Sequence, residues 1–278
     1  MINNIDDDPQ ISIVIVNYNT PDLTVDCLKS IDKFPPKQNF EVVLVDNGSE
    51  KESVNALENL SLKNFKVKMI FNGNNLGFAK ANNQGIKQAK GEYVLLLNSD
   101  TEVKPRSIDM LLEFAKTEGS VGAVGSKLLN SDGSVQASAF RFPTIGRAIK
   151  QYWLGKKNLL DKYIPSDNQP TDVEVLVMAA LLITPQTLKK VGLLDERYFM
   201  FFEDFDYCRR IKQAGLKVFY LPESEVIHHH GASGKKITDQ ANQWRRLVPS
   251  SKIYHGILGH CIYNFILWSS QKMLQLSK

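Results

Sequence analysis

The stretch "ISIVIVNYNTPDLTVDCLKSI", residues 11–31, predicts a buried strand followed directly by a helix. Its first part is a run rich in isoleucine and valine, whereas its second part repeats apolar residues at helical spacing. Pro21 stands where the helix would begin, a position that proline favours. Because the first run is apolar almost throughout, and not only at alternate positions, we expect a strand that is covered on both faces.

The same alternation continues along the first half of the chain. Expected strands cover residues 40–46, 66–71, 93–100 and 121–129, and expected helices cover residues 52–62, 77–89 and 106–117. Alternation of this kind predicts an α/β fold, in which a mostly parallel, Rossmann-like sheet carries helices on both faces.

The second half of the chain has a less regular pattern. Apolar residues lie near helical spacing from 145 to 164, with five basic residues between them, which predicts a basic amphipathic helix. Residues 132–143 predict a turn and a strand, 175–184 a buried strand, 185–192 a short helix, and 216–222 and 225–233 two further strands. We therefore expect the sheet to extend into this half.

The composition is that of an ordinary globular protein. With 278 residues, of which 43% are hydrophobic, the chain is long enough to bury a sizeable core. Its three cysteines form no Cys-x-x-Cys pair, which favours a reducing, cytoplasmic setting without disulfides or a zinc site. The polar start "MINNIDDDPQ" (1–10) predicts no secretory leader, and no apolar run approaches the roughly 18 residues of a spanning helix.

The C-terminal part carries the positive charge. From His228 onward there are seven Lys or Arg residues and one acid, although the net charge of the whole chain is only +4. Residues 253–268, "IYHGILGHCIYNFILW", contain no charged Asp, Glu, Lys or Arg. This segment fits a core-packing helix or a contact in a homo-oligomer, and it equally fits a helix that lies on an anionic membrane face. Residues 145–164 are a second candidate for that contact or for a lid. We expect no nucleic-acid partner.

Two nucleotide-binding motifs are absent. No G-x-G-x-x-G follows the first strand, which disfavours a hydride-transfer enzyme, and "GASGKK" (231–236) has the wrong spacing for a P-loop. Ligands of parallel sheets bind beyond the carboxyl ends of the strands. Small or polar residues stand at these positions: Asn17 and Tyr18, Asp46, residues 72–77, and residues 98–100. We therefore expect a ligand site at this edge of the sheet.

The stretch "YFMFFEDFDYCRR", residues 198–210, sets three acids directly after a run of bulky apolar residues. A helix that begins at these acids and ends before Gly215 explains them, because acids favour the positive N-terminal end of a helix. It does not explain the aromatic run, which we interpret as the dry wall of a site. Against such a wall, desolvation would raise the pKa of Asp204 and the helix N-terminus would lower it.

Five motifs, taken in order, resemble the glycosyltransferase family 2 enzymes of the GT-A fold over about residues 10–235. They are "VDNGS" (45–49), "NNLGFAKANNQG" (74–85), "LLLNSD" (95–100), "GLLDERYFMFFEDFDYCRRIKQAG" (192–215) and "VIHHHGAS" (226–233). Within that family the chain looks most like the bacterial rhamnosyltransferase-type members. The resemblance implies a GT-A domain at 8–235, with a nucleotide-sugar half at about 8–104 and an acceptor half at about 105–235, followed by a basic, apolar helical extension at 236–278.

The resemblance also implies the donor site. Asp46 would contact the nucleotide base, whereas Asn75, Gly77 and Asn83 belong to the segment under the base and ribose. A helix that starts near Phe78 would aim its amide groups towards phosphate. The remaining residues expected to contact the nucleotide sugar are Asn17, Tyr18, Asn98, Ser99, Asp100 and Lys127.

A divalent cation, Mg²⁺ or Mn²⁺, is the implied cofactor. Asp100 matches the second aspartate of the family's Asp-x-Asp motif, which holds the cation on the diphosphate. Asn98 stands in place of the first aspartate, so strict dependence on the metal does not follow. His228 matches a histidine that reaches the metal in similar enzymes, with His229 and His230 as alternatives and a polar turn as the purely structural interpretation.

The acidic stretch receives its roles from the same resemblance. In the family, the second acid of the pair takes the proton from the acceptor hydroxyl, and this acid is here Asp204. Glu203 would bind an acceptor hydroxyl, and Asp206 would serve the helix start or a nearby cation. Arg141 is implied on the acceptor side and Lys127 near the leaving group, with a solvated surface as the alternative for both.

The implied function is inverting glycosyl transfer from a nucleoside-diphosphate sugar to a saccharide or lipid-linked saccharide in surface polysaccharide synthesis. L-Rhamnose from dTDP-L-rhamnose is favoured over a hexose from UDP by the resemblance alone. A sugar nucleotidyltransferase would need a glycine-rich, basic signature after the first strand, and "NYNTPDLT" (17–24) has none. A non-catalytic nucleotide-sugar-binding module is the other alternative. The expected location is the cytoplasm, with peripheral contact on the inner face of the cell membrane.

Overall fold

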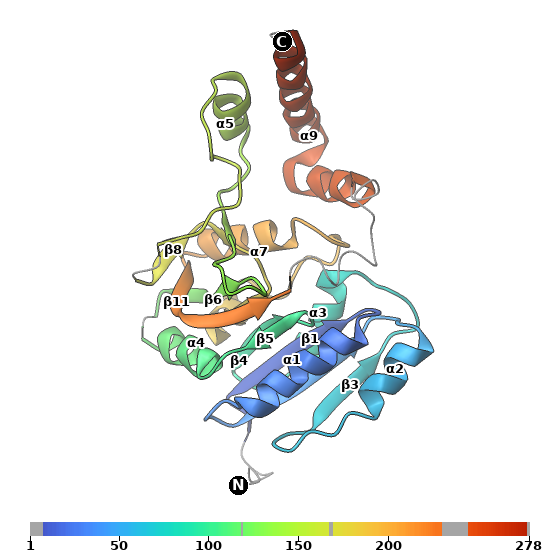
Figure 1. Ribbon diagram of the computed structural model, residues 1–278. Coiled ribbons are helices and arrows are strands. Elements are labelled where there is room, and N and C mark those ends of the chain that lie inside the picture. Colours follow the sequence, from blue (N-terminus) through green and yellow to red (C-terminus); the bar gives the residue numbers. More distant parts are fainter. Residues whose placement is uncertain (1–7, 118, 167–168, 230–243, 277–278) are drawn as a thin grey trace.

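The computed structural model describes residues 8–117, 119–166, 169–229 and 244–276, and its centre is a mixed sheet (Figure 1). The strands of this sheet are β1 Ile11–Asn17, β2 Phe40–Asp46, β3 Val67–Phe71, β4 Tyr93–Asn98, β5 Thr101–Val103, β6 Val121–Leu129, β8 Thr171–Val173, β10 Ala180–Ile183 and β11 Lys217–His228. Among the described residues their order is β3-β2-β1-β4-β10-β6-β11-β5, and β8 also pairs with β11. Strands β1 to β4 are mutually parallel, as are β6 and β11, so the predicted mostly parallel sheet is confirmed.

The prediction of one strand at 175–184 was wrong. The segment forms β9 (Val175–Leu176), which pairs with β7 (Ala139–Phe140) in a small second sheet, and then β10, which runs antiparallel between β4 and β6. The chain changes partner between these strands, because the Val177 amide donates to Ser138 whereas the Ala179 carbonyl accepts from Asn98. Apolar periodicity alone does not reveal such a change.

The two strands expected at 216–222 and 225–233 are one strand, β11. Its pairing with β6 shifts in register between Leu221 and Glu225. Pro222, which has no amide hydrogen for the ladder, lies inside this irregular part. The proline therefore interrupts the pairing without ending the strand.

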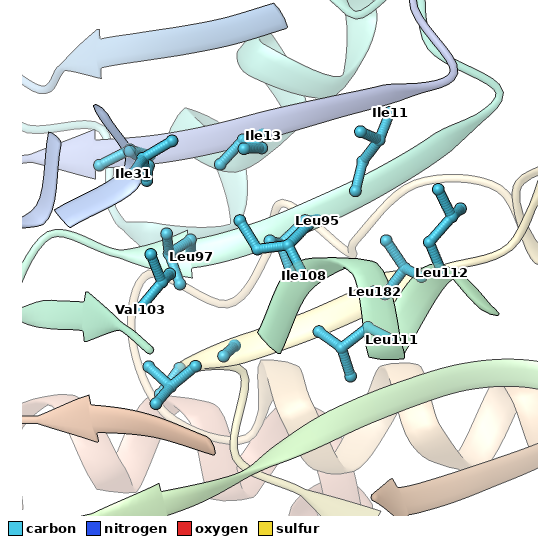
Figure 2. Packing of buried hydrophobic residues seen from close by; sticks show 14 of the residues in the cluster. Ile11, Ile13, Ile31, Leu95, Leu97, Val103, Ile108, Leu111, Leu112 and Leu182 are labelled. Atoms are coloured by element: carbon cyan, nitrogen blue, oxygen red, sulfur yellow. The ribbon is translucent and has the colours of Figure 1, made fainter. Parts of the chain in front are cut away.

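Helices cover both faces of the sheet, as predicted. They are α1 Pro21–Lys33, α2 Lys51–Glu58, α3 Phe78–Gln88, α4 Ser107–Ala115, α6 Pro185–Lys190 and α7 Glu203–Gln213. Alternate residues of β1 point to opposite faces: Ile11 and Ile13 join the core under α1, α2 and α4, whereas Val14 joins the core under α3 and α7. Figure 2 shows Ile11 and Ile13 in the first of these cores, near Leu95 of β4.

Two prongs project from the same side of the molecule (Figure 1). The first holds α5 (Ile145–Ala148) and a short π-helix, η1 (Ile149–Trp153). The second is α9 (Trp244–Leu276), the predicted C-terminal helical extension, which is kinked at Gly256, where φ is 72°. None of the helices in the described part of the chain is long and apolar enough to cross a membrane.

The helix predicted over 145–164 was too long, because the helical part of this segment covers only residues 145–153. It ends after Trp153, and the chain continues through two left-handed residues, Gly155 and Asn158. The Gln151 side-chain oxygen then accepts hydrogen bonds from the amides of Leu159 and Leu160, each over 2.8 Å. These bonds turn the segment back towards the sheet.

Candidate active site

A cavity of about 600 Å³ lies beyond the carboxyl ends of β1 and β4, where ligands of such sheets bind. The residues predicted for the site that line it are Tyr18, Asn75, Gly77, Asn98, Ser99, Asp100, Arg141, Glu203, Asp204 and His228. The aromatic run before the acids lines it too, through Phe199, Met200, Phe201 and Phe202. The fold thus brings together residues that are more than two hundred positions apart.

The two acids are presented by a strained turn. Phe201 and Phe202 have φ angles of 70° and 68°, a region that non-glycine residues seldom occupy. The turn ends at Phe202, and Glu203 and Asp204 form the first turn of α7. Strain of this kind costs about 1–3 kcal/mol per residue and persists only where the surroundings hold it. Both carboxylates consequently face the cavity.

The first half of α9 holds this turn in place. The Ser250 hydroxyl donates to the Met200 carbonyl over 2.9 Å, and the Arg246 guanidinium lies 4.9 Å from the Phe199 ring centroid. Phe202 packs against Tyr254, with ring centroids 5.2 Å apart. The C-terminal extension is therefore part of the structure that positions the acids.

Burial perturbs both acids. Desolvation raises the pKa of Asp204, and the Phe205 amide, which donates to its Oδ1 over 2.8 Å, opposes this effect together with the charge of Lys162. Desolvation also raises the pKa of Glu203, and the charge of Asp204 raises it further. Oε2 of Glu203 accepts no hydrogen bond from the described residues. Two neighbouring acids with raised pKa values in a cleft are typical of acid–base chemistry.

Asp100 and His228 form a pair on the cavity wall. Nε2 of His228 lies 3.4 Å from Oδ1 of Asp100, and its Nδ1 lies 2.7 Å from Oε1 of Gln136. The Gln136 amide nitrogen donates to Asn130, so its oxygen is the acceptor for Nδ1–H. Nε2 is then the ring nitrogen that faces the carboxylate. A cation shared by the two side chains would lie between Nε2 and Oδ1.

This pair fits Mg²⁺ or Mn²⁺ as a partial ligand set. One carboxylate and one imidazole suit these ions, which commonly take their other ligands from water and phosphate. Within the described ranges, no cluster of three or more His, Cys, Asp or Glu side chains is arranged to hold a metal. Asn98, which replaces an acid, lines the same cavity.

The three candidate histidines differ in what the structure shows of their surroundings. His228 faces Asp100, whereas Nε2 of His229 lies 2.7 Å from Oε1 of Glu102 and its Nδ1 lies 2.8 Å from the Ser131 hydroxyl. His229 is not among the residues that line the cavity. His230 lies outside the described residues.

Asn17 and Asp46 lie behind the cavity lining and bind each other. The Asn17 amide donates to Oδ1 of Asp46 over 2.7 Å, and Oδ2 of Asp46 accepts from the Ser49 amide over 3.0 Å. Asn17 also accepts from Thr20 and Thr24. Both side chains therefore stabilise the loops that follow β1 and β2.

Asn47 was missed by the sequence reasoning although it follows Asp46. Its amide donates to Oδ1 of Asn75 over 3.0 Å, and its own oxygen accepts from the Leu76 amide over 3.0 Å. It also lines the cavity. Asn47 thus joins the loop after β2 to the loop before α3.

One of the amides expected to face phosphate at the start of α3, that of Phe78, is bonded within the protein. The Phe78 amide donates to the Phe199 carbonyl over 2.7 Å. Gly77, with a φ of 88°, permits this approach, because a Cβ there would lie 2.5 Å from the same carbonyl oxygen. The α3 N-terminus therefore anchors the strained turn.

Replacing Gly77 with alanine is expected to lower the free energy of unfolding by about 2 kcal/mol or more, because the added Cβ meets backbone and favours a different φ. Urea denaturation of the purified protein measures this. Gly73→Ala is the matched control: no heavy atom of the described residues lies within 4 Å of its added Cβ, so its change should stay within about 0.5 kcal/mol. Equal stabilities of the two variants would contradict the contact.

Two other predicted residues lie elsewhere. The Asn83 amide donates to the Leu194 carbonyl over 2.8 Å and to Glu196, and this buried residue is not among those lining the cavity. Lys127 forms an ion pair with Glu225, with 2.9 Å between Nζ and Oε1. The first connects α3 to a later loop and the second lies on β6, so neither contributes a side chain to the cavity wall.

The cavity lining also contains residues that the sequence did not single out. Arg141, which was predicted, lies over the Tyr163 ring at 4.6 Å and donates to the Asn158 carbonyl. Lys162, whose pKa is lowered by burial, lines the cavity near Phe140. Tyr263 of α9 lines it as well. Nothing in the local sequence distinguishes Lys162 from the other lysines of its segment.

Comparison with known proteins identifies relatives of this chain. Over 210 residues, 69% of this chain and 67% of the relative, the sequence is 32% identical to N-acetylglucosaminyl-diphospho-decaprenol L-rhamnosyltransferase of Mycobacterium tuberculosis (strain CDC 1551 / Oshkosh). It is 27% identical over 228 residues to dTDP-rhamnosyl transferase RfbF of Shigella flexneri, which covers 81% of this chain and 70% of that protein.

The solved structure of GalNAc-T7 with UDP, GalNAc and Mn²⁺ has the same fold, with a TM-score of 0.60 at 19% identity. The match covers 82% of this chain but only 47% of that one. This likeness confirms the expected GT-A fold. Residues 12–171, more than half of the chain, match the family described as Glycosyl transferase family 2. With this match and a relative of 32% identity, the chain belongs to glycosyltransferase family 2.

Proposed function

We propose that this glycosyltransferase moves a sugar, with inversion, from a nucleoside-diphosphate sugar to a hydroxyl group of a saccharide or a lipid-linked saccharide. The observation that carries the proposal is a single cavity that is lined both by the acids Glu203 and Asp204 and by the pair of Asp100 and His228. A donor in this cavity would have its diphosphate near the pair and its sugar near the acids.

Asp204 would act as the base. The acceptor hydroxyl must lose a proton as its oxygen attacks the anomeric carbon, and the leaving nucleoside diphosphate departs on the opposite face. Burial raises the pKa of Asp204 and thereby makes its carboxylate a stronger proton acceptor. The same carboxylate, in a site from which water is excluded, would stabilise the positive charge that develops on the sugar.

Glu203 would bind the acceptor. Its pKa is raised by burial and by the charge of Asp204, so that it remains protonated to a higher pH than an ordinary glutamate. A protonated carboxyl group donates one hydrogen bond and accepts others. Glu203 can therefore hold an acceptor hydroxyl while Asp204 takes the proton. Arg141 and Lys162 are positively charged residues that also line the cavity, and they would help to hold the acceptor.

Asp100 and His228 would hold the divalent cation, and the donor's diphosphate would complete its ligands. The cation supplies positive charge that stabilises the leaving diphosphate. Gln136 fixes the His228 ring so that Nε2 faces Asp100. Because Asn98 is neutral, the protein contributes one carboxylate fewer than an Asp-x-Asp site, and weak metal affinity in the absence of donor is expected.

The favoured donor is dTDP-L-rhamnose, and the favoured pathway is surface polysaccharide synthesis. The support is the similarity to two proteins whose names specify rhamnosyl transfer, at 32% and 27% identity. A UDP-hexose is the second candidate, because the GalNAc-T7 structure contains UDP in a cavity of the same fold.

A panel of donors, each with Mn²⁺, with Mg²⁺ and with EDTA, tests the proposal through two readouts. Nucleoside diphosphate release reports the reaction, and protection against thermal unfolding reports donor binding. We expect dTDP-L-rhamnose to give the largest effect in both, and EDTA to reduce both. Release of pyrophosphate from a nucleoside triphosphate would instead indicate a nucleotidyltransferase. Binding of donors without any transfer to saccharide acceptors would contradict the proposed reaction.

A further inference from the structure

Exposed apolar side chains lie along the two prongs. They are Trp153, Leu154, Ile257, Leu258, Phe265 and Trp268, and together they are called the prong surface. Ile257 and Leu258 each expose 75% of their area. Leu258, Phe265 and Trp268 lie on one face of α9, because their spacings of seven and three residues return to the same side of a helix. Single exposed apolar residues are ordinary, but a gathered stripe marks an interaction surface.

The prongs support each other, so the surface is continuous. The Trp153 indole donates to the Ser269 hydroxyl over 2.9 Å, and its ring meets Phe265 edge to face at a centroid distance of 6.4 Å. Phe265 in turn contacts Trp268 at 6.0 Å. In Figure 1, η1 follows α5 at the end of the first prong, and the second prong continues to the C-terminus. Side chains from both prongs therefore form one apolar patch.

Most of the charges around this patch are positive, although the exposed acid Asp161 also lies on the first prong. Exposed lysines flank it on both prongs: Lys150, Lys156, Lys157, Lys252 and Lys272. Residues 244–276 contain no Asp or Glu. A partner with negative charge is attracted to such a surface, whereas a second copy of the same surface would bring like charges together. Charge complementarity thus favours an anionic partner over a symmetric dimer through this patch.

The prong surface adjoins the mouth of the catalytic cavity. Leu160 of the first prong and Leu247 and Tyr263 of α9 line the cavity, and Tyr263 lies in the same helical half as Phe265. The first half of α9 also holds the strained turn through Ser250 and Tyr254. A molecule bound along the prongs would therefore lie beside the acids.

We propose that the prong surface docks on an anionic lipid bilayer, with its aromatic and aliphatic side chains in the interface and its lysines on the headgroups. Amphipathic, basic elements with exposed tryptophan and phenylalanine bind membranes in this way. The inference rests on the proposed function in one respect: it specifies the lipid-linked class of acceptor, whose saccharide would reach Asp204 while its lipid stays in the bilayer.

Sedimentation of the full-length protein with vesicles tests the docking without donor or acceptor. Vesicles of phosphatidylcholine with phosphatidylglycerol should bind the protein, and vesicles of phosphatidylcholine alone should bind it at least about tenfold less. The double variant Leu258→Glu/Phe265→Glu should lose about tenfold or more of the binding, because it places charge in the interface. Phe71→Glu, at a residue 49% exposed on β3, is the matched control and should bind as the wild type does.

A second variant separates charge from hydrophobicity. Lys150→Gln/Lys156→Gln/Lys157→Gln leaves the apolar residues in place and should weaken binding only to the anionic vesicles. Tryptophan fluorescence should shift to shorter wavelength on binding. The shift should be smaller in Trp268→Phe, in which Trp153 is the tryptophan of the prong surface that remains.

Three outcomes would overturn docking: equal binding to both vesicle types, equal binding by the double variant and Phe71→Glu, or a stable dimer by light scattering that Leu258→Glu/Phe265→Glu dissociates. Transfer to a water-soluble saccharide acceptor distinguishes the two proposals. If the wild type transfers sugar but does not bind vesicles, docking fails alone; if it binds vesicles but transfers nothing, the proposed reaction fails alone.

Discussion

Replacing Asp204 with asparagine is expected to reduce the rate of sugar transfer by about 10²–10⁴-fold, because the amide cannot take the proton from the acceptor hydroxyl. The asparagine keeps the shape of the side chain and its place at the start of α7, so donor binding should change little. The measurement is kcat at saturating acceptor, with donor-dependent thermal protection as the test of binding. Full transfer activity in a correctly folded Asp204→Asn protein would exclude Asp204 as the base.

The stability of the folded protein provides a control, because the substitutions of Asp204 and of Asp206 should change it in opposite directions. Because burial raises the pKa of Asp204 in the folded state, its charge opposes folding above the pH at which the unfolded aspartate ionises. The wild type should thus lose stability as pH rises through the folded pKa of Asp204, and Asp204→Asn should lose less. Asp206 is different: it pairs with Arg209 over 2.9 Å and Arg210 over 2.7 Å, and its side chain is 7% exposed.

Asp206→Asn should therefore lower the free energy of unfolding by about 2 kcal/mol, because two partly exposed guanidinium groups lose their charged, buried partner. Urea denaturation of both variants at several pH values measures the contrast. The rate of transfer should also depend on pH. It should rise as Asp204 ionises, and this rise should occur above the pH of about 4 at which an ordinary aspartate titrates.

The second large effect is expected at the pair of Asp100 and His228, which lines the same cavity as these acids. Asp100→Asn should reduce kcat/KM for the donor by about a hundredfold, and His228→Gln by about ten- to a hundredfold, because each removes a ligand or its charge from the diphosphate end of the cavity. Added Mn²⁺ should restore part of the His228→Gln activity, since one ligand, Asp100, remains. The measurement is the initial rate of transfer as a function of Mn²⁺ concentration.

His229→Gln is the matched control for this prediction. His229 is the next residue along the chain, but it binds Glu102 and Ser131 outside the cavity. Its loss should leave the metal dependence of transfer unchanged. Equal effects of the two histidine substitutions, or a wild-type rate that is indifferent to EDTA, would contradict the assignment of Asp100 and His228 to the cation.

The sequence by itself determined the alternating strands and helices of this protein. The apolar runs at β1, β2 and β4 and the helical spacing of α1 and α3 each lie within a dozen or so residues, so local patterning was sufficient to predict them. The edge of the sheet at which the site lies follows from the same pattern, because parallel strands end at one edge. The carboxylates of Glu203 and Asp204 were also visible, as acids at a helix start after an aromatic run.

The tertiary structure alone decided which of these residues meet. Pro222 lies within β11 instead of ending it, and β10 enters the sheet antiparallel, because the partners of these strands are remote in sequence. His228 and not His229 faces Asp100, although the two are adjacent in the sequence, because successive side chains at the end of β11 point to opposite sides. Asn83 and Lys127 lie away from the cavity because Leu194 and Glu225 bind them. Contacts between distant segments are set by packing and hydrogen bonding of the folded chain, and local periodicity carries no information about them.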